Sequence, residues 1–333
     1  MTAAPRITIV GASLAGLRSA EAVAAALPGA RITLIGAEAE APYNRPPLAT
    51  DAAETLARDP GAAAEVFAKL LLRSKLAPEA VQMRLGVAAT GIEGTTVRLA
   101  DGTAVAGDHV IAATGLRPRR IPLPGAEDRR HVLRSFADLR RLASQLRPAA
   151  RMVVVGGGFI GCEIAATGRK LGLEVGIVEP APQPMLRALG PRVAAAMAAL
   201  HRAHGVILRT GRAVAGFSDE GVILDDGQAL EAEVIVEALG SHPNVEWLAG
   251  SGADLSDGVL VDATMRAPGA PGLLAVGDVA RFANPLFGPE ARRVEHWCVP
   301  GQTAKRAAET LAAHAAGKEP VPGFAPMPSF WSD

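Results

Sequence analysis

The sequence predicts an α/β protein with two similar units, each built on a parallel β-sheet. The first observation is a repeat, because residues 6–16 (RITIVGASLAG) recur 145 positions later as residues 151–161 (RMVVVGGGFIG). Each copy combines an apolar run typical of a buried strand with a glycine turn and the start of a helix. The second observation is that the similarity continues beyond these motifs. Together they predict two βαβ units of the kind that binds a dinucleotide.

Both copies continue with a helix and a second strand. The Ala- and Leu-rich residues 17–27 predict a helix that ends at a Pro-Gly pair, and residues 31–36 predict the strand after it. In the second copy, we expect a helix as far as about Leu171 and a strand over 174–178.

Each half also contains a predicted hairpin. Asp-Gly pairs at 101–102 and 226–227 lie between apolar stretches, which is a strong hairpin signal. The strand that follows ends at Gly115 in the first half and at Gly240 in the second, 13 residues after the turn glycine in both. A small antiparallel meander is therefore expected beside each parallel unit.

The last third of the chain adds elements outside the repeat. Residues 273–278 (LLAVGD) predict a buried strand that ends in Gly-Asp, and an Ala-rich helix is expected over about 302–316. Residues 320–333 contain four prolines and are expected to be extended.

Composition excludes several classes of function. A chain of 333 residues predicts about two domains. The net charge of zero gives no electrostatic case for binding nucleic acid or an anionic membrane. No apolar run approaches the roughly 18 residues that span a bilayer, and the N-terminus does not resemble a signal peptide. Cys162 and Cys298 form no CxxC-type pair. We therefore expect a cytoplasmic protein with two reduced thiols and no metal site.

The first glycine turn has the chemistry that a pyrophosphate requires. Backbone N–H groups at a helix N-terminus bind the phosphates, and small residues allow their close approach. Gly11 and Gly16 occupy the outer positions of the GxGxxG pattern, and Ser13 occupies the middle one. Glu38 follows the next strand, where a carboxylate accepts both hydroxyls of an adenosine ribose.

The second copy is a complete GxGxxG motif, formed by Gly156, Gly158 and Gly161. Glu179 ends its second strand, 18 residues after the last glycine. A carboxylate there favours an unphosphorylated ribose and repels a 2′-phosphate. We therefore expect NADH rather than NADPH, a preference that the nearby Arg187 would soften.

Five segments along the chain carry a resemblance to a known family: GASLAGLRSAEA, PYNRPPL, GGGFIGCEIAA, AVGDVARF and VEHW. In this order they resemble the FAD-dependent, NADH-oxidising ferredoxin and rubredoxin reductases of the pyridine nucleotide-disulphide oxidoreductase superfamily. The resemblance implies a glutathione-reductase-like fold with two Rossmann-like domains. Residues 1–115 and 242–318 would form the FAD-binding domain, and 116–241 an inserted NAD(H)-binding domain. Residues 319–333 would lead to an absent C-terminal domain.

The resemblance also implies the cofactor contacts. The implied FAD-binding residues are Gly11, Ser13, Leu14, Ala15, Gly16, Glu38, Arg45, Pro46, Ala89, Thr114, Gly115, Arg134, Gly277, Asp278, His296 and Trp297. The implied NADH-binding residues are Gly156, Gly158, Phe159, Ile160, Gly161, Glu179 and Gly240. Asp278 would bind a ribityl hydroxyl, although a helix cap is its simpler interpretation out of context. Trp297 would lie beside the flavin, or would be an ordinary core residue.

The expected mechanism follows from a motif that this sequence lacks. Superfamily members that reduce disulfides have a redox-active cysteine pair beside the flavin, and this chain has none. Electrons that reach the flavin are therefore expected to leave for an external acceptor. Hydride transfer from nicotinamide C4 to flavin N5 needs stacked rings, and the protein supplies orientation and excludes water.

One position departs from the family pattern. The family has a lysine in its PPLSK segment, which lies by the flavin and pairs with the glutamate that is Glu163 here, whereas this chain has Thr50. Glu163 and Thr50 are thus the expected catalytic positions. Because a nearby cation stabilises a reduced, anionic flavin, we expect slower reduction by NADH than in the relatives.

Three interpretations of function remain open. The first is a reductase that passes electrons from NADH through FAD to a ferredoxin-type iron–sulfur protein serving an oxygenase. The second is an NADH-driven reductase or oxidase whose acceptor is a free flavin, a quinone, oxygen or another small molecule. The third is a nucleotide-binding subunit or degenerate enzyme with little turnover.

Two features bear on partners. The arginines between residues 117 and 141 form either a docking surface for an acidic electron carrier or, more simply, a solvated face. The family continues past the segment FWSD into a further domain that covers part of the flavin. A separate chain in place of that domain is therefore a further expected partner.

Overall fold

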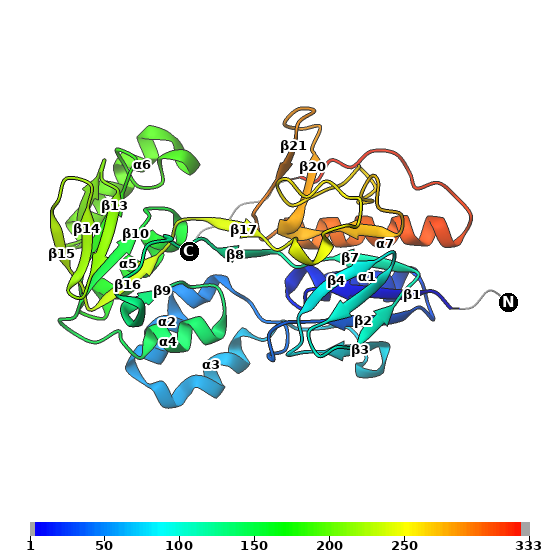
Figure 1. Cartoon of the computed structure of the whole chain (residues 1–333), viewed down its shortest axis with the longest axis horizontal. Helices are drawn as coiled ribbons and strands as arrows, with labels where there is room; N and C mark the ends of the chain where they lie inside the picture. The colour runs from blue at the N-terminus through cyan, green and yellow to red at the C-terminus, as the bar shows by residue number, and fades with distance from the viewer. Residues whose placement is uncertain (1–3, 328–333) are drawn as a thin grey trace. The chain divides into compact units, whose positions relative to one another are not determined.

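Two five-stranded parallel sheets form the centres of two separate units (Figure 1). The computed structural model describes residues 4–327. Unit 1 consists of the residues up to 43, residues 71–116 and the residues from 243 onward. Unit 2 consists of residues 44–70 and 117–242. The expected α/β class is confirmed.

The sheet of unit 1 has the strand order β19-β7-β1-β2-β3, and all its neighbours are parallel. Its central strands are rich in Ile, Leu and Val and are buried, as a sheet covered on both faces requires. The strands are β1 (Arg6–Val10), β2 (Arg31–Ile35), β3 (Val81–Arg84), β7 (His109–Ala112) and β19 (Leu273–Ala275).

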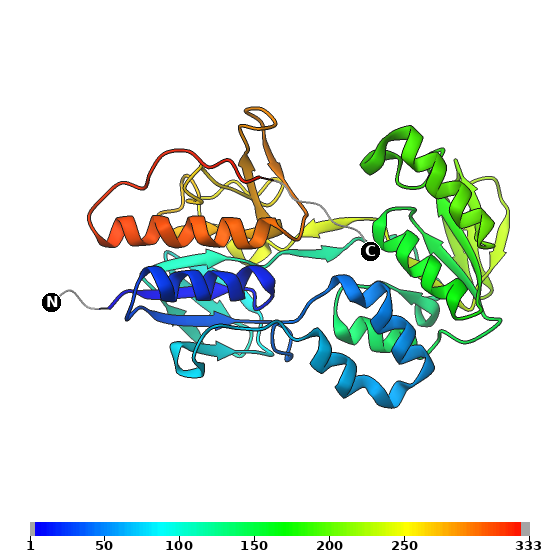
Figure 2. The same ribbon diagram turned by 180° about the vertical axis from the view of Figure 1, so that it is seen from behind.

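Two helices of unit 1, α1 (Leu14–Ala26) and α7 (Val299–Ala315), pack side by side (Figures 1 and 2). Two three-stranded sheets complete the unit. The first is the antiparallel meander of β4 (Ala89–Glu93), β5 (Thr96–Leu99) and β6 (Ala104–Ala106). The second contains β18 (Val259–Leu260), β20 (Ala280–Ala283) and β21 (Ala291–Arg293). Short 3-10 turns lie at Pro78–Ala80, Glu246–Leu248 and Gly277–Val279.

Unit 2 repeats this plan with the strand order β12-β11-β10-β16-β9, again parallel throughout. The strands are β9 (Arg130–His131), β10 (Arg151–Val155), β11 (Glu174–Glu179), β12 (Ile207–Thr210) and β16 (Val234–Glu237). The meander beside them contains β13 (Val214–Ser218), β14 (Gly221–Leu224) and β15 (Ala229–Glu231).

The helices of unit 2 come from two parts of the chain. Residues 117–242 contribute α4 (Phe136–Ala143), α5 (Phe159–Lys170) and α6 (Leu186–Ala203), the last of which is kinked at Gly190. Residues 44–70 add α2 (Asp51–Arg58) and α3 (Ala63–Leu70), with 3-10 turns at Pro46–Ala49 (η1) and Pro60–Ala62. A further 3-10 turn lies at Glu127–Arg129. Helix α2 packs against α4 and α5. Residues 44–70, which the sequence predicts to belong to the first domain, group with unit 2 in the structure.

The chain leaves unit 1 in β8 (Leu116–Pro118) and returns in β17 (Ser241–Pro243), and these strands pair as a two-stranded sheet. Both expected Asp-Gly turns join neighbouring meander strands, β5 to β6 and β14 to β15. Residues 319–327 form no helix or strand, while the FWSD segment lies outside the described residues. No helix within residues 4–327 is both long enough and apolar enough to cross a membrane.

Candidate functional site

The two glycine turns have the same backbone hydrogen bonds. In unit 1, the Gly11 N–H donates to the carbonyl of Ile35 at 2.8 Å, which ties the turn to the end of β2. In unit 2, the Gly156 N–H donates to the carbonyl of Val178 at 2.8 Å, at the equivalent place on β11. The repeat in sequence is therefore a repeat of local structure.

The outer glycines are required by close approach of backbone to backbone. A Cβ on Gly11 would overlap the carbonyl of Ala113, and a Cβ on Gly156 would overlap the carbonyl of Ala238. Both glycines also have positive φ, +116° and +108°. The last glycine of each motif, Gly16 or Gly161, lies against the carbonyl oxygen of the first.

The middle position differs between the copies, and the structure explains why. A Cβ on Gly158 would meet nothing within 4 Å, so a side chain is tolerated there, and Ser13 occupies this position in unit 1. Both residues precede the first residue of a helix. Neither of these two described helices, α1 and α5, has an acidic residue in its first turn. Their N-termini therefore suit an anionic group such as a pyrophosphate.

Each unit has a glutamate near the end of its second strand: Glu38 follows β2, and Glu179 is the last residue of β11. The Tyr43 hydroxyl donates to Glu38 Oε2 at 2.5 Å, which orients the carboxylate in unit 1. In unit 2, Glu179 accepts hydrogen bonds from the backbone N–H of Gly157 at 2.7 Å and of Ala181 at 2.8 Å. These contacts hold the Glu179 carboxylate directly at the glycine turn.

The Gly-Asp motif at 277–278 lies at the first glycine turn. Gly277 has a φ of +68°, and a Cβ there would come within 2.7 Å of the Ala15 Cβ. Its N–H donates to Thr303 Oγ1 on α7 at 3.0 Å. Asp278 is half-buried in the same 3-10 turn. The structure therefore brings β19, α7 and the start of α1 together.

The other predicted FAD contacts of unit 1 occupy different places. Thr114 Oγ1 donates to the Asn244 carbonyl at 2.6 Å beside Gly115, where the chain leaves the unit. Ala89 is the half-buried first residue of β4. Trp297 is 47% exposed, so the alternative interpretation of this residue as core is wrong.

His296, by contrast, is half-buried, and its Nδ1 lies 3.0 Å from Cys298 Sγ at the start of α7.

Three predicted FAD contacts lie in unit 2 instead. Arg45 Nη1 donates to the Arg134 carbonyl at 2.6 Å, so these two residues are neighbours. Pro46, the next residue, is exposed and begins η1. Arg134 directly precedes Ser135, which caps α4 in a capping box.

Thr50 and Glu163 lie on elements that pack together. Thr50 lies between η1 and α2, and Glu163 lies on α5, which packs against η1. One helical turn after Glu163, Thr167 Oγ1 donates to the Ala49 carbonyl at 2.8 Å. The residue before Thr50 is therefore hydrogen-bonded to the helix that carries Glu163.

The remaining predicted NADH contacts are accessible. Phe159 and Ile160, the first residues of α5, are 40% and 45% exposed. Gly240 is exposed with a φ of +85°, and its carbonyl accepts a hydrogen bond from the Arg119 N–H at 2.9 Å. Four residues that support these positions were not predicted from the sequence: Tyr43, Thr303, Asn244 and Arg119. Of these, only Tyr43 lies within a quoted motif.

The two thiols, Cys162 and Cys298, are both free and belong to different units. Burial raises the pKa of the Cys162 thiol to about 11, and the nearby Glu163 and Glu179 carboxylates add to this effect. Cys162 is therefore a protonated, inert thiol at neutral pH.

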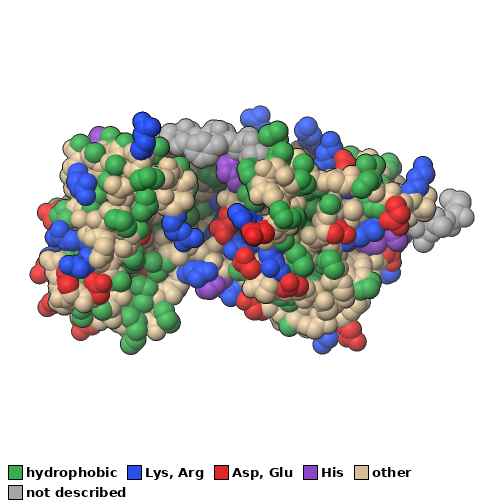
Figure 3. All heavy atoms as spheres, turned by 90° about the horizontal axis from the view of Figure 1, so that it is seen from above, with side chains coloured by type: hydrophobic (Ala, Val, Ile, Leu, Met, Phe, Trp, Pro, Cys, Tyr) green, Lys and Arg blue, Asp and Glu red, His purple; other side chains and the backbone are tan. Residues whose placement is uncertain are grey.

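Charge on the surface does not form one broad patch on the visible face. Acidic and basic side chains are interspersed on the face drawn in Figure 3. Within the arginine-rich stretch, Arg120 and Arg130 pair with Glu237, and Arg141 pairs with Asp138. Much of this stretch is therefore committed to internal contacts.

Comparisons with known proteins agree with this geometry. Residues 5–309 match the family model of pyridine nucleotide-disulphide oxidoreductases. The chain is 36% identical to the ferredoxin–NAD(+) reductase component of the anthranilate 1,2-dioxygenase system of Burkholderia cepacia, over all of this chain and 80% of that protein. It is 33% identical to putidaredoxin reductase of Pseudomonas putida, over all of this chain and 79% of that protein.

A solved structure gives the same answer. The covalent complex of putidaredoxin reductase with putidaredoxin contains a chain that matches with a TM-score of 0.86 and 32% identity, over all of this chain and 79% of that one. The resemblance noted in the sequence is thus confirmed, and with it the expected class of enzyme. This protein belongs to the pyridine nucleotide-disulphide oxidoreductase family.

Proposed function

We propose that this protein is an FAD-dependent reductase that takes electrons from NADH and passes them to a ferredoxin-type iron–sulfur protein. The main support for the proposal is the pair of glycine turns. The two turns make equivalent hydrogen bonds and equivalent close contacts, each within its own unit, and each lies beside a glutamate. Each glycine turn together with its glutamate would form one dinucleotide-binding site, which we call a cradle. Hydride transfer between two nucleotides requires two such sites.

The first cradle suits FAD. Gly11, Ser13 and Gly16 would bind the pyrophosphate at the start of α1, and Glu38, oriented by Tyr43, would bind the adenosine ribose. Asp278 would bind a hydroxyl of the ribityl chain. Leu14, Ala15, Ala89, Thr114, Gly115, Gly277, His296 and Trp297 would complete the contacts from unit 1, and Arg45, Pro46 and Arg134 those from unit 2.

The second cradle suits NADH. Gly156, Gly158 and Gly161 would bind its pyrophosphate, with Phe159 and Ile160 beside it. Glu179, held by the Gly157 and Ala181 N–H groups, would accept from the ribose hydroxyls and disfavour a 2′-phosphate. Gly240 would allow close approach of the backbone.

In the proposed reaction, the cofactor and the protein have different roles. When bound, FAD supplies a ring that accepts a hydride from NADH and gives the electrons up again singly. The chain itself binds and orients the two nucleotides, while Glu163 beside η1 adds negative charge near the reaction. The protonated Cys162 takes no part, so the electrons go to an external acceptor.

The relatives indicate the acceptor. One is the reductase component of a dioxygenase system, and another forms a complex with putidaredoxin. We therefore assign a small ferredoxin that serves an oxygenase as the partner. We also place the protein in the cytoplasm, since NADH is available there and both cysteines are free thiols.

The test is anaerobic reduction of the purified protein after loading with FAD. We expect NADH to bleach the flavin absorbance and a ferredoxin then to restore it. If NADH bleaches the flavin but only free flavin or oxygen restores it, the assigned partner is wrong. If NADH leaves the absorbance unchanged, the proposed function is wrong.

A further inference from the structure

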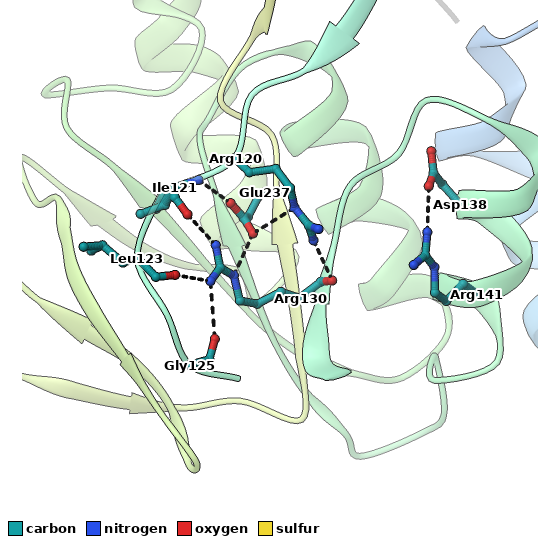
Figure 4. Close-up of polar contacts among 8 residues, drawn as sticks. All are labelled: Arg120, Ile121, Leu123, Gly125, Arg130, Asp138, Arg141 and Glu237. Carbon is teal, nitrogen blue, oxygen red and sulfur yellow. Dashed lines mark hydrogen bonds and ion pairs between the residues drawn. The ribbon is translucent and has the colours of Figure 1, made fainter. Parts of the chain in front are cut away.

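A buried ion pair lies at the carboxyl end of the central sheet in unit 2. The Glu237 side chain, at the end of β16, has no exposed surface, and that of Arg130 on β9 is 7% exposed. Arg130 Nε donates to Glu237 Oε1 at 2.8 Å, and Arg120 Nε lies 3.6 Å from the same oxygen. Figure 4 shows the carboxylate between the two guanidinium groups. A buried charge pair of this kind is costly unless every donor and acceptor is used.

The ion-pair network of Glu237, Arg130 and Arg120 is hydrogen-bonded to one segment of chain, residues 119–125. Arg130 donates to the carbonyls of Ile121 at 2.7 Å, Leu123 at 2.5 Å and Gly125 at 3.3 Å. Glu237 Oε2 accepts from the Ile121 N–H at 2.7 Å. The Arg130 guanidinium also lies 3.9 Å from the centre of the Phe217 ring. Residues 119–125 are thus fastened to the edge of the sheet by both members of the pair.

The fastened segment in turn holds the backbone around Gly240. The Arg119 N–H donates to the Gly240 carbonyl, and Arg119 Nε donates to the Ser241 carbonyl, both at 2.9 Å. Ala238, next to Glu237, supplies the carbonyl that lies against Gly156. Residues 237–241 therefore connect the buried ion pair with the second glycine turn.

The other half of the chain shows that this pair is not needed to build the sheet. At the position of Glu237, unit 1 has Ala112, which is buried and pairs with β19. Unit 2 has the two-residue strand β9 at the same place, held by Arg130 instead. The charged network is therefore an addition of unit 2, located where its cradle meets the strand end.

We propose that Glu237 and Arg130 are positioning residues for the nicotinamide nucleotide, acting through residues 119–121 and the backbone at Gly240. This inference rests on the proposed function, because it assumes that unit 2 binds NADH. Loss of the network should leave the glycine turn and its glutamate in place but displace the backbone at Gly240. Loss of the network should therefore weaken the binding of NAD(H) and leave the FAD content unchanged.

The test compares FAD-loaded wild type with Glu237→Gln, Arg130→Lys and the double variant Glu237→Leu/Arg130→Met. The readouts are the Kd for NAD+ by calorimetry, the KM for NADH and the kcat with ferricyanide, FAD content and the unfolding midpoint. The control is Arg141→Met, which removes the exposed Arg141–Asp138 pair of the same region (Figure 4).

We expect Glu237→Gln to raise the Kd for NAD+ and the KM for NADH about tenfold, with kcat within about twofold and FAD content unchanged. Arg130→Lys should have a smaller effect of the same kind, because an ammonium cannot reproduce the guanidinium fork. The double variant removes both charges and should approach the wild-type unfolding midpoint while its Kd stays raised. Arg141→Met should match wild type throughout.

A double variant that is stable and binds NAD+ with the wild-type Kd would overturn the inference, since the network would then be purely structural. The same conclusion would follow if Glu237→Gln and Arg130→Lys fold and bind NAD+ normally. A wild-type protein that fails to bind NAD+ would instead contradict the proposed function itself.

Discussion

The two glycine turns share one design but differ in how far they are covered. In unit 1, Ala15 is only 9% exposed, because Gly277 lies against it and α7 packs beside α1. In unit 2, the equivalent residue Ile160 is 45% exposed, and so is much of the neighbouring Phe159. Strand β9 occupies the place of β19 in unit 2, but it is not followed by a Gly-Asp turn.

The difference in exposure indicates how one fold can bind two kinds of ligand. A turn that the protein itself covers suits a cofactor that stays bound through many turnovers. An open turn suits a nucleotide that must enter and leave in each cycle. The covered turn thus matches FAD and the open turn matches NADH, as the proposed function requires.

The largest expected effect comes from filling the two outer glycine positions. Gly11→Ala puts a Cβ into the Ala113 carbonyl at a positive φ, and we expect FAD to be lost during purification. Gly156→Ala makes the same change against Ala238, and we expect FAD to be retained while the Kd for NAD+ rises at least about tenfold. Flavin absorbance after gel filtration and calorimetry measure both.

The matched control for this pair is Gly216→Ala, on the meander strand β13 of unit 2. A Cβ at this position meets only the Ile223 side chain, at 3.8 Å, so we expect NAD+ binding to change less than about twofold. If Gly11→Ala lost NAD+ binding while keeping FAD, the assignment of the two cradles would have to be reversed.

Much of this arrangement could be predicted from the sequence because it depends on local patterns. The glycine motifs, the Asp-Gly turns and the LLAVGD strand each have a period or turn residue that indicates one structure. The grouping of residues 44–70 with unit 2 could not be predicted, because it depends on packing against α4 and α5.

The supporting contacts of the site were also hidden. Thr303 binds the N–H of Gly277 from a helix that carries no motif. Glu237 and Arg130 are 107 residues apart in sequence, and no spacing rule joins them.

The next largest effect concerns position 50 in unit 2, where the chain has an uncharged threonine in place of a lysine. Helix α5 carries Glu163 beside η1, where Thr50 stands at the family's lysine position. We expect Thr50→Lys to accelerate reduction of the flavin by NADH about fivefold, since one nearby charge is worth about 1 kcal/mol when solvated. Stopped-flow measurement with Thr50→Met as the uncharged control decides this. A rate equal to or below wild type would count against the role of this position.

The buried histidines predict that unit 2 loses more stability than unit 1 as the pH is lowered. Burial lowers the pKa of His131 and His201 in unit 2 and of His109 in unit 1. The unfolded chain therefore binds protons more readily, so their contribution to stability is complete above about pH 6.5 and declines as the pH falls below it. We expect the denaturant midpoint to fall between pH 7.5 and about 5.5, with NAD+ binding lost before FAD.

The control for this experiment is His242→Asn, since His242 is exposed. It should follow the wild-type pH profile, whereas His201→Leu should flatten it. A midpoint that stays constant or rises toward pH 5.5 would contradict the prediction, because it would mean that the folded chain binds protons at least as readily as the unfolded chain.

The smallest effect concerns an ion pair that occurs in equivalent form in each unit, at the first residue of β1 or β10. Arg6 binds Asp108 in unit 1, and Arg151 binds Glu233 in unit 2. The hydrogen bond from Arg151 lowers the pKa of Glu233 to about 2. Stability from Glu233 is therefore present above about pH 4.5 and lost as the pH falls toward 2.

Because both side chains of this pair are about a third exposed or more, we expect Glu233→Gln to cost only about 1 kcal/mol at pH 7. The difference from wild type should shrink as the pH is lowered from 4.5 toward 3. Denaturant unfolding checks this, and a difference that does not change with pH would mean that the charge of Glu233 is unimportant.

The most direct test of the account is to count nucleotides in a single preparation. FAD-loaded protein is passed through gel filtration with excess NAD+ and then titrated with NADH under anaerobic conditions. The account predicts one FAD and no NAD+ per eluted chain, and complete bleaching of the flavin by one equivalent of NADH. Elution without FAD, or flavin absorbance that NADH does not change, would contradict the division into a resident and an exchanging nucleotide.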